Sequence, residues 1–190
     1  MTAPTPPPLD TRRKAPSRGA KAAAIVDFLV EALDGDPSSS LRRALILADI
    51  AANPGTTQSQ AMARLDIPKS AMIREVEWLF DHGCVQREES AADARARPLF
   101  VFGPAREALD AALAVVDGDT RRLQNFLKGF ITVIKKERPT LRDAKILSVL
   151  YDRGSAEKKD IIAALYDGSP TTEYRALAEL IEEGMIRDDD

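Results

Sequence analysis

The sequence predicts a mainly α-helical fold, namely a winged helix-turn-helix with one small β-hairpin wing, flanking dimerisation helices and a second, C-terminal helix-turn-helix-like unit. Three observations predict it. Apolar residues recur at helical spacing along most of the chain. Two short helical patterns meet at a tight turn at Asp66-Ile67, and a hairpin pattern follows over residues 84–102. Part of this arrangement recurs after residue 140.

The composition predicts a globular protein with an N-terminal arm. The 190 residues are 44% hydrophobic and carry a net charge of -3, which suits one or two ordinary domains. Five prolines lie within residues 1–17, so we expect a disordered arm there, made basic by Arg12, Arg13 and Lys14. No apolar run is long enough for a signal peptide or membrane span, and Cys84 is the only cysteine, so we expect a cytoplasmic protein with no membrane partner.

The expected domains are residues 18–117, the winged unit with flanking helices, and residues 120–190. A helix over 20–33 carries the apolar stripe Ile25, Phe28 and Leu29, and a second helix covers 40–52. The third helix, from 57 to 65, starts with the capping-box pair Thr57 and Gln60.

The helix that begins at residues 68–70 has two different faces. Met72, Val76 and Leu79 repeat at the spacing of a core face. The opposite side carries Lys69, Ser70, Ile73 and Arg74, which are the side chains that a DNA groove would meet. Four aromatic residues at helical spacing are read as core rather than as base-stacking platforms; these are Trp78, Phe80, Phe126 and Phe130.

A hairpin follows, with strands at 84–87 and 99–102 and a tip that contains Asp93, Arg95 and Arg97. Beyond it we expect helices over 104–116 and 120–136. The first of these carries the apolar stripe Leu109, Leu113 and Val116, which needs a partner surface.

The segment after residue 140 matches the first unit at an offset of 100 and, after a one-residue insertion, at 101. We expect Ser155 to cap one of its helices and Ser169-Pro170 to start the next. No wing pattern follows Ile186-Arg187. Residues 169–190 contain seven acids and two bases, which is a poor charge for DNA contact.

Residues 66–70, 79–85 and the wing Asp93-Ala-Arg95-Ala-Arg97 resemble the winged-helix regulators of the MarR family, over about residues 22–116. The resemblance implies a wing arginine in the minor groove, here Arg95 positioned by Asp93, and a helix in the major groove that carries Lys69, Ser70 and Arg74. It also implies pairing of two copies through terminal helices. The apolar stripes of the first and fifth expected helices could form that interface.

We therefore expect a dimeric, sequence-specific transcription regulator that binds double-stranded DNA. The DNA-contacting residues would be Lys69, Ser70, Ile73, Arg74, Arg95, Arg97, Arg12, Arg13 and Lys14. One alternative is an interaction module that binds another protein through the winged-helix shape and the acidic second unit. A second is an architectural DNA-binding protein whose affinity comes from the arm. The residues do not indicate whether a small-molecule effector is sensed.

Catalytic and metal sites are not expected. The chain has one histidine, His82, near its one cysteine, Cys84, and lacks the further ligands that a zinc site needs. We recognise no catalytic triad, glycine-rich phosphate loop or acidic metal cluster, so the protein is not expected to be an enzyme or to hold a cofactor.

Overall fold

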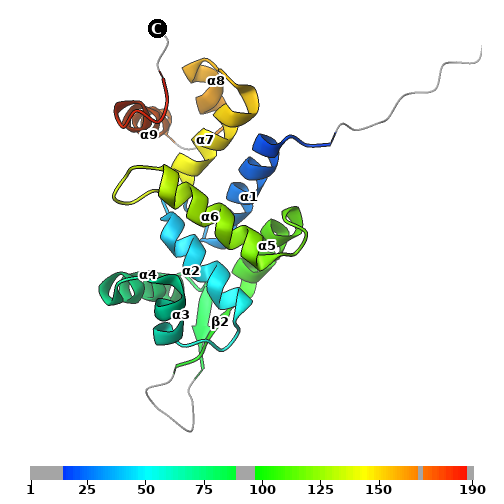
Figure 1. The fold of residues 1–190 in the computed structure, drawn as a ribbon, viewed down its shortest axis with the longest axis vertical. Helices are drawn as coiled ribbons and strands as arrows, with labels where there is room; N and C mark the ends of the chain where they lie inside the picture. The colour runs from blue at the N-terminus through cyan, green and yellow to red at the C-terminus, as the bar shows by residue number, and fades with distance from the viewer. Residues whose placement is uncertain (1–14, 89–96, 167–168, 188–190) are drawn as a thin grey trace, which may run out of the picture.

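The structure is a computed structural model that describes residues 15–88, 97–166 and 169–187. It confirms a mainly helical protein with a small two-stranded hairpin (Figure 1). The elements are α1 (Arg18–Ala32), α2 (Leu41–Ala52), α3 (Gln58–Leu65), α4 (Lys69–Asp81), β1 (Val85–Arg87), β2 (Leu99–Val101), α5 (Gly103–Val115), α6 (Thr120–Val133), α7 (Leu141–Arg153), α8 (Lys158–Ala163) and α9 (Pro170–Glu182). None of the helices in these described ranges combines the length and apolarity needed to cross a bilayer.

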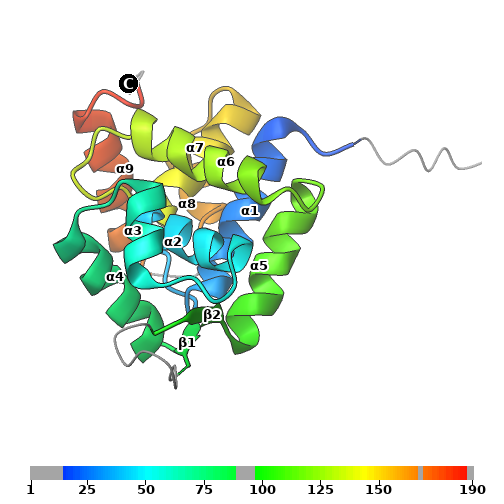
Figure 2. The same cartoon turned by 60° about the horizontal axis from the view of Figure 1, so that its bottom comes forward.

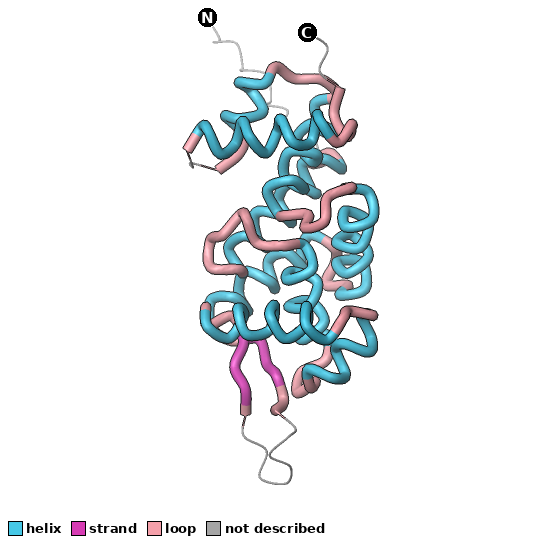
Figure 3. Tube along the Cα trace, turned by 90° about the vertical axis from the view of Figure 1, so that its left-hand side faces the viewer, coloured by secondary structure: helices cyan, strands magenta, loops and turns pink. Residues whose placement is uncertain are grey.

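The two strands form an antiparallel ladder that leaves one end of the helical body (Figure 3). Val85 pairs with Val101 and Arg87 with Leu99. The strands are shorter than expected, because Phe102 already serves as the N-cap of α5 while its N–H bonds the Cys84 carbonyl at 3.0 Å.

Strand β2 is also tied to the loop before α3. The Gly55 N–H donates to the Leu99 carbonyl at 3.0 Å, and the Leu99 N–H donates to the Thr56 carbonyl at 2.8 Å. The Leu99 side chain is buried, so β2 joins the hairpin to the hydrophobic core.

Helices α1 and α5 pack against one another within the chain. Ile25, Leu29 and Leu109, from the two stripes that were expected to pair between subunits, are 4%, 0% and 0% exposed. These three side chains are therefore not available for the expected dimer interface, whereas Phe28, Leu113 and Val116 of the same stripes are only partly buried. Apolar surface that is already removed from water cannot be buried again on association.

The N-terminal and C-terminal segments are packed crosswise. Helix α1 lies against α7, while α6 lies against α2. Between them the starts of α2 and α7 form an antiparallel bridge that joins Ser40 to Thr140. The two backbone bonds are reciprocal: Leu41 N–H donates to Pro139 O at 2.9 Å, and Leu141 N–H donates to Ser39 O at 3.0 Å.

The close approach of α1 to α7 depends on Gly19. A Cβ at Gly19 would lie 2.6 Å from the Cα of Asp152, which is backbone that cannot rotate away. We expect Gly19→Ala to lower the free energy of unfolding by about 1–3 kcal/mol, measured by urea denaturation, because overpacking forces the helices apart.

Gly129 on α6 provides the matched control for Gly19. Nothing lies within 4 Å of a Cβ placed there. Gly129→Ala should stabilise the protein by about 0.5–1 kcal/mol through the helix propensity of alanine. Equal responses of the two glycines would contradict this account of the α1–α7 contact.

Helices α7, α8 and α9 follow one another as α2, α3 and α4 do (Figures 1 and 2). Thr140 and Asp143 form a capping box at α7. The expectation for Ser155 was wrong, because α8 begins later, at Lys158, with Glu157 as its N-cap. Ser169 and Pro170 start α9 as expected, although the Ser169 side chain makes no capping bond.

Candidate nucleic-acid interface

The candidate site is built on a helix-turn-helix, which consists of α3, α4 and the turn between them. The expected capping box is present: Thr57 N–H donates to Gln60 Oε1 at 2.8 Å, and Gln60 N–H donates to Thr57 Oγ1 at 3.3 Å. Asp66 ends α3 with φ 52°, a left-handed conformation that aspartate tolerates and that reverses the chain within two residues. Ile67 is buried beneath the turn and fixes the angle at which α4 begins.

Helix α4 is held on α2 by a buried ion pair. Arg43 Nε donates to Glu75 Oε2 at 3.0 Å, with side-chain exposures of only 4% and 1%. Arg43 Nη1 also donates to Ser39 Oγ at 3.0 Å. Burial lowers the pKa of Arg43 and Glu75 opposes that shift; an arginine in such a pair stays charged.

Trp78 packs against the Arg43 guanidinium of this ion pair. The Arg43 guanidinium lies 3.7 Å from the Trp78 ring centroid, and the His82 ring stacks on Trp78 at 3.7 Å. His82 Nδ1 lies 2.9 Å from the Trp78 carbonyl oxygen. Trp78 is thus part of the packing, as expected. The same expectation was wrong for Phe80, which is 44% exposed beneath the Arg87 guanidinium.

A second ion pair fixes α3. Arg64 Nη2 donates to Asp49 Oδ2 at 2.6 Å and Nε donates to Oδ1 at 3.1 Å, so the pair is bidentate. The same Nη2 donates to Thr56 Oγ1 at 2.7 Å. The hydrogen bond to Asp49, opposed by burial, raises the pKa of Arg64. Arg64 is therefore occupied by structure and is not free to contact phosphate.

The outward face of α4 carries the four side chains that the sequence indicated. Lys69, Ser70, Ile73 and Arg74 are all exposed, while Met72, Val76 and Leu79 are buried as expected. The first turn of α4 has no side-chain capping bond, because Pro68 stands at the N-cap. This uncapped helix start with exposed Lys69 and Ser70 carries the positive end of the helix dipole, which favours anions.

The wing base is attached to the C-terminal half of α4. Arg87 Nη2 donates to Glu77 Oε1 at 2.6 Å, so these two charges neutralise one another. Arg97 is exposed two residues before β2, and Glu88 is exposed directly after β1, where its N–H donates to the Pro98 carbonyl at 3.1 Å. Asp93 and Arg95 of the tip, and Arg12, Arg13 and Lys14 of the arm, lie outside the described residues.

Cys84 lies inside the base of the wing as a small buried residue. Burial, the largest cause, raises its pKa to about 11, so the thiol stays protonated at neutral pH and is a poor nucleophile. Within the described ranges no group of three or more histidine, cysteine, aspartate or glutamate side chains could hold a metal ion.

Comparison with known families assigns the unit described above. Residues 40–96 match the family model described as MarR family. Over these residues the chain is similar to the winged helix-turn-helix proteins of the MarR family. Proteins of the MarR family bind DNA, typically act as dimers and regulate transcription, which supports a DNA-binding transcription regulator in general. Neither a curated protein nor a solved structure matches the chain.

The exposed face of α4 was predicted from the sequence, but the buried ion pair between Arg43 and Glu75 that holds α4 on α2 was not. Glu75 follows Met72 by three residues and precedes Leu79 by four, so it lies on the core face of α4. A carboxylate in an apolar stripe requires a buried cation, and Arg43 in the preceding amphipathic helix is the partner. The position of Glu75 in the sequence therefore indicates the buried ion pair.

Proposed function

We propose that this protein is a sequence-specific transcription regulator that reads double-stranded DNA with α4 in the major groove and the wing in the minor groove. The observation that supports the proposal is the outward face of α4, whose basic and polar side chains are exposed beside a helix start that no side chain caps. An α-helix fits the major groove, and side chains near its N-terminal end reach base edges.

The residues of α4 divide into two roles. Ser70 and Ile73 carry no charge and suit contact with base edges, where Ile73 offers an apolar surface for a thymine methyl group. Lys69 and Arg74 suit phosphates or guanine. Arg74 also lies 3.5 Å from Glu75, but its side chain is 61% exposed and can turn toward DNA. The buried Arg43–Glu75 pair keeps all four on a rigid support.

The wing and the arm complete the proposed contact. Arg95 and Arg97 would enter the minor groove, where a narrow groove concentrates negative potential. Arg12, Arg13 and Lys14 would contact phosphates and would add affinity with little sequence preference. Glu88 is exposed near the wing and would lower the affinity of this part for phosphates.

We also propose that the protein assembles into a homodimer, and the packing within one molecule restricts which surfaces two copies can share. Ile25, Leu29 and Leu109 of the α1 and α5 stripes are buried in one molecule, so two copies on DNA would meet through the partly buried rest of these stripes or through other surfaces. Two-fold symmetry of such a pair would match two half-sites about one DNA turn apart.

The decisive experiment is selection of bound duplexes from a random pool by the purified full-length chain. We expect wild type to enrich one motif and the Arg95→Ala, Arg97→Ala double variant to relax it at the wing positions. Ser70→Ala should relax a single central position, and loss of one base contact should cost about 1–3 kcal/mol. Arg121→Ala, an exposed arginine on α6, is the control and should leave the motif unchanged.

The salt dependence of binding, together with two variants, distinguishes this proposal from a protein-interaction module and from an architectural DNA-binding protein. The logarithm of affinity should fall with the logarithm of salt concentration by about 0.9 per phosphate contacted. Failure to enrich any motif would sink the sequence-specific reading. If deletion of residues 1–17 abolished binding and Lys69→Ala had no effect, the protein would be architectural instead.

A further inference from the structure

The two units are related by a local two-fold symmetry at the point where they meet. Helices α6 to α9 repeat α1 to α4 in order. Ser40 and Thr140, which are equivalent at an offset of 100, form an antiparallel bridge with one another, and the two backbone bonds beside it are also exchanged between equivalent residues. The packing of α1 on α7 and of α6 on α2 follows the same exchange. One chain is therefore arranged as the two subunits of a symmetric dimer would be.

Helix α9 is the equivalent of α4 under this symmetry. Each helix has 13 residues, and each is followed two residues later by a glycine with a left-handed φ angle, 66° after α4 and 68° after α9. A buried glutamate holds each of them on its own unit. Glu75 pairs with Arg43 of α2, and Glu173 pairs with Arg142 of α7 at 3.0 Å while its side chain is only 1% exposed. Both helices are thus fixed from their inner side.

The outward face of α9 repeats the chemistry of the outward face of α4. Three outward positions correspond at an offset of 101 and carry a hydroxyl, a large side chain with apolar surface and an arginine; these are Ser70 and Thr171, Ile73 and Tyr174, Arg74 and Arg175. All six side chains are exposed. Ile73 and Tyr174 are 42% and 45% exposed, so much of each is open to a ligand. Lys69 differs, since Pro170 stands at the equivalent position.

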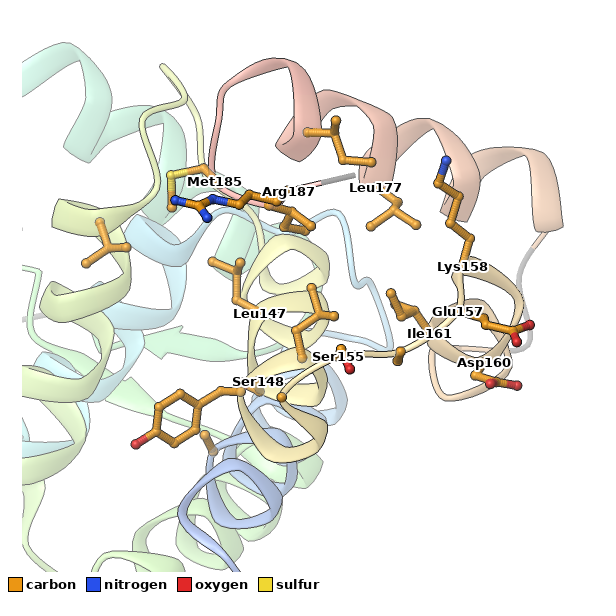
Figure 4. A pocket seen from close by; sticks show the side chains of 18 of the residues that line it. Leu147, Ser148, Ser155, Glu157, Lys158, Asp160, Ile161, Leu177, Met185 and Arg187 are labelled. Atoms are coloured by element: carbon orange, nitrogen blue, oxygen red, sulfur yellow. The ribbon is translucent and has the colours of Figure 1, made fainter. Parts of the chain in front are cut away.

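Both outward faces lie on one side of the molecule. In Figures 1 and 2 α4 and α9 form the left-hand edge, and Figure 3 turns this edge toward the reader. The inner side of α9 carries Leu177, which lines a cavity of about 1200 Å³ between α7, α8 and α9 (Figure 4). Dimeric helix-turn-helix proteins use two such symmetry-related helices on one side to reach two successive major-groove segments.

The start of α9 is less acidic than the total charge of residues 169–190 indicates. Glu173 is buried in its ion pair, and Glu179 pairs with Lys136 at 2.8 Å. Arg175 is exposed and forms no ion pair with a described residue. A phosphate or a guanine could therefore pair with Arg175 without breaking an existing ion pair.

Other acidic side chains near this surface should weaken its contact with DNA. Glu182 and Glu183 are exposed at the end of α9. On the side of α8, Glu157 pairs with Lys159 at 2.7 Å, while Figure 4 shows Glu157 and Asp160 pointing away from the cavity into solvent. Like charges near phosphates reduce affinity. We therefore expect a DNA contact at α9 to be weaker than the contact at α4.

We propose that α9 is a second DNA-contacting helix, so that one chain binds two unequal half-sites, the first through α4 and the second through α9. This inference rests on the proposed function of α4. Thr171 and Tyr174 would contact base edges, and Arg175 would contact a guanine or a phosphate. A second copy is then not needed to occupy two half-sites. A homodimer of the kind proposed above would carry four such helices.

The test uses the duplex selected by the full-length chain and a second duplex in which one half-site is scrambled, namely the half-site that Ser70→Ala leaves unchanged. Tyr174→Ala and Arg175→Ala should each lower the affinity for the selected duplex by at least about fivefold, because each removes a contact with that half-site. Neither variant should change the affinity for the scrambled duplex. Ser70→Ala should weaken binding to both duplexes, and native mass spectrometry should show one chain per duplex.

Tyr151→Ala is the matched control, because Tyr151 is an exposed tyrosine of the second unit that lies on α7. It should leave both affinities unchanged. A motif with a single half-site, or affinities that Tyr174→Ala and Arg175→Ala do not alter, would overturn this inference and leave the proposed function of α4 intact. Two identical half-sites that Ser70→Ala relaxes together, with two chains per duplex, would overturn it in favour of the homodimer. Failure to select any motif would overturn both proposals.

Discussion

Glu75→Ala is expected to lower the free energy of unfolding by about 3–5 kcal/mol, because removal of one member of a buried ion pair leaves the other charge without compensation. Arg43 would keep its hydrogen bond to Ser39 and its contact with Trp78, but it would lose the carboxylate 3.0 Å from its Nε. Since Glu75 belongs to α4 and Arg43 to α2, the loss should also loosen the helix that we propose reads DNA. Urea denaturation followed by circular dichroism would measure the first effect.

The same helix provides the control for Glu75. Glu77 pairs with Arg87 at 2.6 Å, but its side chain is 50% exposed, so Glu77→Ala should cost less than about 1 kcal/mol. An Arg43→Met, Glu75→Leu double variant should recover most of the stability, because an apolar pair of similar volume leaves no buried charge. A Glu75→Ala protein as stable as the Glu77→Ala protein would refute the structural role of this pair.

Leu99→Ala should cost about 2–5 kcal/mol, which is the range for truncation of a fully buried leucine when the site does not collapse. Its backbone bonds to Gly55 and Thr56 would hold β2 in place, so the space vacated by the side chain would remain. The midpoint of urea denaturation should fall accordingly.

Phe102→Ala tests whether burial, rather than membership of the hairpin region, decides this result. Phe102 follows β2 directly and is 52% exposed, so its truncation should change stability by no more than about 0.5 kcal/mol. A loss for Phe102→Ala comparable to that for Leu99→Ala would show that the hairpin region as a whole, and not Leu99, carries the stability.

The elements with local signals were predictable from the sequence. Thr57 and Gln60 form the capping box that their spacing indicated, and Met72, Val76 and Leu79 form the core face of α4. Local periodicity was sufficient because both features involve residues within one or two helical turns. For the same reason the outward position of Lys69 and Ser70 could be read from the opposite face.

Features that depend on distant segments could not be read in this way. The stripe of Ile25 and Leu29 indicated only that a partner was needed, and the choice between another chain and α5 depends on tertiary packing. Phe80 was assigned to the core from its spacing, but Arg87 from the wing covers part of its ring and leaves the rest in water. The groove contacts of Arg95 and of the arm remain predictions.

The crosswise packing has a consequence for how the molecule tolerates change. Leu123 and Leu127 of α6 are fully buried, and α6 packs on α2, while α1 packs on α7. Because these four helices pack on one another across the two units, a destabilising substitution in any of them should lower the stability of the whole molecule. A substitution deep in the second unit would reduce the fraction of chains in which α4 is folded, without altering any residue of the proposed DNA contact.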